Sequence, residues 1–105
     1  MEAAQVVTAL AALAQPTRLA IYRLLVVQGP SGMAAGQIAE TLGVSPANLS
    51  FHCKTLSHAG LLDTRQEGRF VFYQANFAAM NAMLAYLTEN CCAGEACGIS
   101  NQPCE

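Results

Sequence analysis

One segment, residues 44–62, most constrains the fold of this chain because it carries the markers of an amphipathic helix at both of its ends. Ser45 is a favourable N-cap residue, and Pro46 follows at the first helical position, where its missing N–H is tolerated. Gly60 predicts the end of the helix. Apolar side chains recur between these limits at helical spacing, which places them on one buried stripe: Leu49, Cys53 and Leu56. The segment therefore predicts a helix over residues 46–59, with Cys53 as an inert thiol in the core.

The opposite side of this helix is mostly polar, and its residues are Asn48, Ser50, Phe51, His52, Lys54 and Thr55. Asn, Ser, His, Lys and Thr near the start of a helix are the residue types that reach phosphates and base edges in a DNA major groove. This pattern alone does not distinguish a DNA-binding helix from any amphipathic surface helix. His52 also fits a satisfied surface residue, and Phe51 also fits a cover for a neighbouring helix.

The segments on either side supply the rest of a DNA-binding fold. Residues 35–42 predict a short helix that Gly43 ends, after a linker at residues 32–34, and this is the spacing of a helix-turn-helix. Residues 61–75 contain two β-prone segments joined at Glu67-Gly68, which predict a hairpin that carries Arg65 and Arg69. A helix-turn-helix followed by a basic hairpin is a winged helix, so Arg65 and Arg69 join the six residues of the helix as predicted DNA contacts.

Two helices precede this unit, over residues 2–13 and 16–28, and one follows it, over residues 77–90 with Asn76 as its cap. The fold class is therefore mainly α, a winged helix-turn-helix of five helices with a β-hairpin wing. A domain of this size leaves one side of its first and last helices uncovered. We expect the apolar stripes of these two helices to form a homodimer interface, made of Val6, Leu10, Leu13, Met80, Met83, Leu84 and Leu87.

The charge is distributed unevenly along the chain. The net charge is −2, but residues 1–88 carry all five basic side chains and only four of the seven acidic ones. Three of the basic residues lie between Lys54 and Arg69, in the predicted helix and wing. This is a small basic patch, and two copies in a dimer would double it. No run of apolar residues approaches the ~20 of a membrane span, and no signal sequence is evident, so we expect a cytoplasmic protein without a membrane partner.

Residues 91–105 form a tail of different composition from the domain at residues 1–90. Four of the five cysteines lie in it: Cys91, Cys92, Cys97 and Cys104. Gly94, Gly98 and Pro103 interrupt regular structure there, and the segment has few side chains that a core would bury. The tail is therefore a candidate ligand-binding segment appended to the domain.

Two segments have a distinctive order of residues. Residues 49–62 read Leu-Ser-Phe-His-Cys-Lys-Thr-Leu-Ser-His-Ala-Gly-Leu-Leu, and they are followed by Arg65-Gln-Glu-Gly-Arg-Phe-Val-Phe-Tyr73. Together these segments resemble the ArsR/SmtB family of winged-helix repressors. Residues 16–25 match the second helix of that family, and the likeness covers roughly residues 10–90. The resemblance implies a homodimeric repressor that leaves its operator DNA when a metal or metalloid binds. The arsenic sensors of the family carry a Cys-x-Cys where this chain has Ala34 and Gly36, and its zinc sensors use Asp and His on a last helix that here contains neither. The tail resembles a subgroup of arsenic-responsive repressors with cysteines after the last helix.

The chemistry of the tail agrees with a soft inducer, because thiolates select soft acceptors over Mg, Ca or Mn. Trivalent arsenic or antimony accepts three thiolates, and Cys91, Cys92 and Cys97 can supply them, with Cys104 as an alternative third ligand. An organoarsenical with two open valences needs only Cys91 and Cys92. The sequence therefore predicts a repressor whose apo dimer binds double-stranded operator DNA and is released by trivalent arsenic or antimony, with no organic cofactor.

Other uses of the same cysteines stay open. A thiol redox sensor, or a repressor responsive to another soft metal such as Cd, Zn or Cu(I), fits the same scaffold. An all-thiolate zinc site usually has Cys-x-x-Cys pairs, and disulfides are uncommon in a reducing cytosol. Two further possibilities remain. The tail could have no function, or the protein could be an enzyme, such as a thiol catalyst of arsenate reduction. Catalysis is disfavoured because catalytic cysteines normally lie beside a helix N-terminus and a cation, whereas these follow a helix C-terminus among Glu89 and Glu95.

Overall fold

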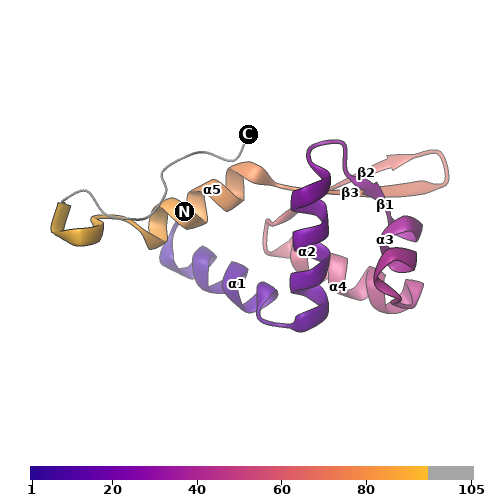
Figure 1. The fold of residues 1–105 in the computed structure, drawn as a ribbon, viewed down its shortest axis with the longest axis horizontal. Coiled ribbons are helices and arrows are strands. Elements are labelled where there is room, and N and C mark those ends of the chain that lie inside the picture. Colours follow the sequence, from indigo (N-terminus) through magenta and orange to yellow (C-terminus); the bar gives the residue numbers. More distant parts are fainter. Residues whose placement is uncertain (95–105) are drawn as a thin grey trace.

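The computed structural model describes residues 1–94 of the chain (Figure 1). These residues form five α-helices, three strands and a final 3-10 turn. In chain order they are α1 (Ala3–Leu13), α2 (Pro16–Gln28), β1 (Met33–Ala34), α3 (Ala35–Leu42), α4 (Pro46–His58), β2 (Leu62–Glu67), β3 (Phe70–Ala75), α5 (Phe77–Leu87) and η1 (Cys91–Gly94). The predicted fold class, a winged helix-turn-helix of five helices with a hairpin wing, is confirmed.

Side-chain caps fix where three of the helices begin. The side chains of Gln15, Ser45 and Asn76 each accept a hydrogen bond from the backbone N–H three residues later, at 2.8, 3.2 and 2.9 Å. Each bond satisfies one of the donors that the first helical turn leaves without a partner. The cap at Ser45 sets the start of α4, as the sequence predicted.

A short third strand extends the predicted hairpin. β2 and β3 pair antiparallel from Leu62 opposite Ala75 to Glu67 opposite Phe70, and β1 pairs with the other side of β3. The expectation that residues 32–34 are only a linker is therefore wrong for Met33–Ala34. Gly32 makes this close approach possible, because a Cβ added at its φ of +70° would lie 2.5 Å from the carbonyl oxygen of Tyr73.

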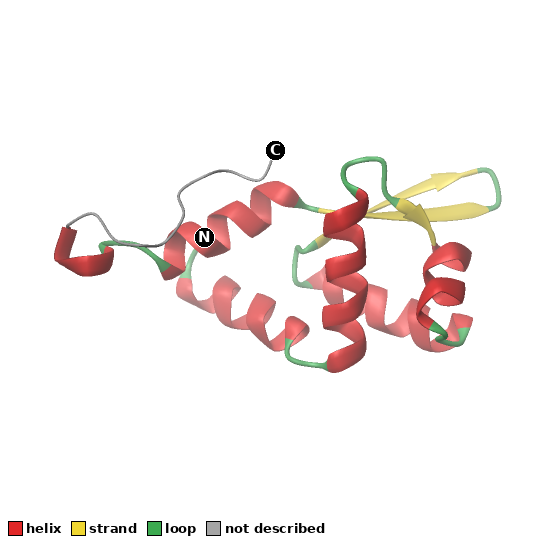
Figure 2. Ribbon diagram, viewed as in Figure 1, coloured by secondary structure: helices red, strands yellow, loops and turns green. Residues whose placement is uncertain are grey.

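The core lies where α2, α3 and α4 pack against the sheet, and α1 extends it by packing against α2 and α4. Its fully buried larger side chains are Ile21, Leu25, Ile38, Leu49, Cys53, Leu56 and Leu61. Figure 2 shows the strands at one end of the molecule, with α1 and α5 at the other. Val6 and Met83, predicted as interface residues, are only 3% and 6% exposed in the single chain. They belong to this core and have almost no surface left to bury in a dimer.

The last helix is shorter than expected. α5 ends at Leu87 with Thr88 as its C-cap, whereas the sequence suggested a helix to residue 90. Asn90 adopts a left-handed φ of 56°, and the 3-10 turn η1 follows at once. The first two cysteines of the tail therefore lie four and five residues after the end of α5, in η1.

Among residues 1–94, one bent pair of helices has the length and apolar composition of a membrane span. No single helix there is long and apolar enough to cross a membrane, although α1 and α2, bent by 102°, meet the length and composition criteria together.

Candidate nucleic-acid interface

The helix-turn-helix consists of α3, the turn at Gly43–Ser45, and α4. Gly43 ends α3 in the left-handed conformation, with φ 66° and ψ 34°, which only glycine adopts without strain. Ile38 on α3 and Leu49 on α4 are both buried, and the two helices are in contact. The predicted apolar stripe of Leu49, Cys53 and Leu56 is confirmed, since each of these residues is at most 1% exposed. The polar side of α4 is thereby fixed in the outward direction.

The predicted contact residues on α4 fall into two groups. Asn48, Ser50, Phe51 and Lys54 are exposed, whereas His52 and Thr55 are half-buried. The Thr55 hydroxyl donates a hydrogen bond to the Phe51 carbonyl oxygen at 3.3 Å, so its proton is already used within the helix. The four exposed residues are the ones that a groove can reach directly.

His52 lies at the edge of this surface. Its ring makes an edge-to-face contact with the Phe51 ring, with centroids 5.6 Å apart and planes at 63°. Its Nδ1 is buried and has no hydrogen-bond partner among residues 1–94. His52 therefore supports Phe51 and can present only part of its ring to a ligand.

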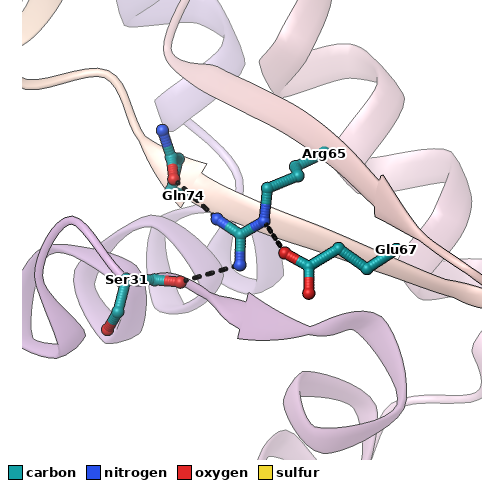
Figure 3. A network of polar contacts seen from close by, with 4 residues as sticks. All are labelled: Ser31, Arg65, Glu67 and Gln74. Atoms are coloured by element: carbon teal, nitrogen blue, oxygen red, sulfur yellow. Dashed lines mark hydrogen bonds and ion pairs between the residues drawn. The ribbon is translucent and has the colours of Figure 1, made fainter.

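The two arginines of the wing have different environments. Figure 3 shows the three polar contacts that Arg65 makes with the rest of the protein. Its Nε pairs with Glu67 Oε2 at 2.5 Å. Its other two nitrogens donate hydrogen bonds to Gln74 Oε1 at 3.3 Å and to the Ser31 carbonyl oxygen at 3.4 Å. The guanidinium carbon also lies 4.7 Å from the centroid of the Phe72 ring. These contacts join both strands of the wing to the loop that precedes β1. Arg65 is thus occupied in holding the wing in place.

Arg69 occupies the turn region of the wing, one residue before β3 begins. It is exposed and makes no ion pair or hydrogen bond with the part of the chain that the structure describes, and the same is true of Lys54. A cation without a protein partner is available for a phosphate. Among the predicted DNA contacts, the basic side chains that are exposed and have no protein partner within residues 1–94 are therefore Lys54 on α4 and Arg69 on the wing.

The cysteines also divide by environment. Burial raises the pKa of the Cys53 thiol to about 12, so this thiol stays protonated and unreactive, as expected for a core residue. Cys91 is half-buried and Cys92 is exposed at the start of η1. Cys97 and Cys104 lie outside the described residues, and within residues 1–94 no three His, Cys, Asp or Glu side chains converge on a possible metal site.

An apolar surface remains on α1 and α5, which contact each other (Figure 1). Of the predicted interface residues, Leu10, Leu84 and Leu87 are 41–53% exposed, while Leu13 and Met80 pack partly against the core. The structure adds Val7, which is 64% exposed and is not among the interface residues predicted from the sequence. Its position next to Val6 gives the signal, because adjacent apolar residues on a helix cannot both face the same core.

Comparisons with known proteins agree with this geometry. A family model described as a helix-turn-helix domain matches residues 13–65. The HTH-type transcriptional regulator YgaV of Escherichia coli K12 is 30% identical over 90 residues, covering 86% of this chain and 89% of YgaV.

Two solved structures are also similar. An ArsR-like transcriptional regulator from Rhodococcus sp. RHA1 has a TM-score of 0.72 and 30% identity, covering 87% of this chain and 82% of its own. The homodimeric winged helix-turn-helix DNA-binding domain of a possible ArsR-family regulator from Mycobacterium bovis has a TM-score of 0.65 and 26% identity, covering 90% and 88%.

Proposed function

This chain belongs to the helix-turn-helix transcriptional regulators of the ArsR-like, winged-helix type, and on that premise we propose that it is a repressor released from its operator by trivalent arsenic or antimony. The observation that carries the proposal is the position of Cys91 and Cys92 in the turn η1, which begins after a three-residue connection from the end of α5. A ligand bound there acts on the helix that carries Leu84 and Leu87 of the apolar surface.

DNA binding rests on the arrangement of α4 and the wing. In the dimer the two copies of α4 enter successive major grooves, roughly 34–36 Å apart. Ser50 and Asn48 offer hydrogen bonds to base edges, and Lys54 contacts a phosphate or a guanine. Arg69 reaches the backbone or minor groove beside the wing, whose position the hydrogen bonds of Arg65 to Gln74 and Ser31 stabilise.

Dimerisation is supported by the exposed apolar side chains of α1 and α5. Val7, Leu10, Leu84, Tyr86 and Leu87 are all at least 38% exposed in the single chain. Covering them removes apolar surface from water and fixes the spacing between the two copies of α4. The homodimeric state of the Mycobacterium bovis domain is consistent with the same arrangement.

Release follows from linkage between the two ligands. Trivalent arsenic is a soft acceptor, and the adjacent thiols of Cys91 and Cys92 supply two thiolates, with Cys97 or Cys104 as the third. If arsenic binds the DNA-free dimer more tightly than the DNA-bound one, it weakens operator binding by the same factor. A coupling of ~1–3 kcal/mol corresponds to ~5–150-fold weaker DNA binding. The mechanical element is α5, because its C-terminal end joins the cysteines to the dimer surface.

A second candidate, a thiol redox switch on the same scaffold, is favoured by one observation. Cys91 and Cys92 are neighbours outside the core, and Cys92 is an exposed thiol that an oxidant reaches directly. Oxidation would then order the same segment without a metalloid. Other soft metals, Cd, Zn or Cu(I), form the third set of possible inducers.

The test is a titration of an operator-bound complex with arsenite in excess reductant. We expect wild type to release DNA and the triple variant Cys91→Ser, Cys92→Ser, Cys97→Ser to stay bound. Cys53→Ala is the matched control, since it removes a buried thiol and should leave release unchanged. Continued release from the triple variant would refute the cysteine site, and release by diamide alone would favour the redox switch.

A further inference from the structure

Phe51 is an exposed aromatic residue on the outermost side of α4. It lies two positions from both Leu49 and Cys53, so helical geometry directs its side chain away from the buried stripe. It is 64% exposed. Single apolar side chains are common on protein surfaces, so exposure alone does not identify a ligand. What distinguishes Phe51 is its place on the side of α4 that the proposed function directs toward DNA.

The neighbours of Phe51 leave its ring open in the direction of a groove. Ala47 lies one turn before it and Lys54 three residues after it on the same side of α4, and both are exposed. Ala47 is too small to shield the ring. On the other side, the His52 ring makes the edge-to-face contact that limits how far Phe51 can turn. The ring is thus both accessible and supported.

The chemistry of the phenyl ring restricts what it can recognise. Phe51 has no hydrogen-bonding group, so it cannot read the donors and acceptors of base edges. The one apolar feature in the major groove of unmodified DNA is the C5-methyl group of thymine, and apolar side chains recognise it by contact. Phe51 belongs to α4 and not to α1 or α5, the two helices that carry the exposed apolar side chains of the proposed dimer surface.

We propose that Phe51 is a specificity-determining residue that contacts the methyl group of one thymine in each operator half-site. This rests on the proposed function, in which α4 enters the major groove. Ser50, Asn48 and Lys54 then supply the polar contacts, and Phe51 adds a preference for thymine at one position.

The test removes the methyl group without altering base pairing. A duplex operator is first selected with the wild-type dimer from random sequences, and each thymine is then replaced symmetrically by deoxyuridine. At one position we expect wild type to bind about fourfold more weakly per half-site, as one methyl group contributes about 0.8 kcal/mol. Phe51→Ala should bind the thymine and deoxyuridine duplexes equally. Val27→Ala, which shortens a 78% exposed apolar side chain on α2, is the matched control and should keep the wild-type ratio.

The outcomes separate this inference from the proposed function. If the wild-type dimer selects an operator but no deoxyuridine substitution weakens binding, Phe51 does not read a methyl group. The same holds if Phe51→Ala keeps the wild-type penalty for deoxyuridine. If no duplex is selected, the proposed function fails and this inference fails with it. Thermal unfolding of Phe51→Ala should match wild type, because the ring lies outside the core.

Discussion

Arg65 and Arg69 belong to the same wing, but replacing them should have different effects on DNA binding. Arg69 has no partner within residues 1–94, whereas Arg65 is bound to Glu67, Gln74 and Ser31. Each phosphate contact changes the slope of log K against log salt by ~0.9 and contributes about eightfold to affinity at ~0.1 M salt. Arg69→Ala removes one contact from each subunit of a dimer. We therefore expect the slope to fall by about 1.8 and the affinity at ~0.1 M salt to fall about 60-fold.

The assay is operator binding measured by fluorescence anisotropy over a series of salt concentrations. The matched control is the double variant Arg65→Ala, Glu67→Ala, which removes the exposed intramolecular ion pair without changing the net charge. We expect it to retain the wild-type salt slope and to lower the free energy of unfolding by up to about 1 kcal/mol, the scale of an exposed ion pair. The assignment is refuted if the double variant loses as much salt dependence as Arg69→Ala.

Three further changes test the core, the sheet and the apolar surface. The pKa of Cys53 is raised from 9.0 to about 12, so the unfolded state loses this proton first and stability falls as pH rises above 9. From pH 8 to pH 10 chemical denaturation of wild type should show about 1.4 kcal/mol more loss than Cys53→Ala, and equal losses would contradict the burial. The Gly32→Ala variant should melt at a clearly lower temperature than the Gly29→Ala variant, because a Cβ at Gly32 meets backbone within 3 Å whereas one at Gly29 meets nothing. Similar melting temperatures for the two variants would argue against the close approach of β1 to β3. The double change Leu84→Glu, Leu87→Glu should give a folded monomer in analytical ultracentrifugation, and an intact dimer would place the interface elsewhere.

Local signals in the sequence predicted most of the fold. Ser45 and Pro46 define the start of α4, and the stripe of Leu49, Cys53 and Leu56 defines its buried face, because capping and helical periodicity depend on residues close together in the chain. β1 was missed because Met33–Ala34 is a strand only through pairing with residues 72 and 73, far along the chain. Two residues carry too little periodicity to predict such a pairing.

The candidate site was predictable only in part, for similar reasons. The sequence identified which side of α4 is buried, but it could not show that His52 and Thr55 are half-buried, and it could not separate Arg65 from Arg69. The distinction depends on Gln74 and Ser31, which folding brings to Arg65 from other parts of the chain. Val6 and Met83 illustrate the same limit, since a stripe on a helix does not reveal which of its residues a neighbouring helix covers. The ligand roles of Cys97 and Cys104 lie outside the described residues and stay a prediction.

The most direct test of coupling between the cysteines and the DNA-binding surface compares two affinities. These are the affinities of arsenite for the reduced protein with operator DNA and without it. Calorimetry on the free dimer and on the dimer saturated with operator duplex gives the two dissociation constants. Because linkage is reciprocal, we expect operator DNA to weaken arsenite binding ~5–150-fold. Equal affinities in the two states, or no arsenite binding to the free reduced dimer, would contradict the proposed mechanism of release.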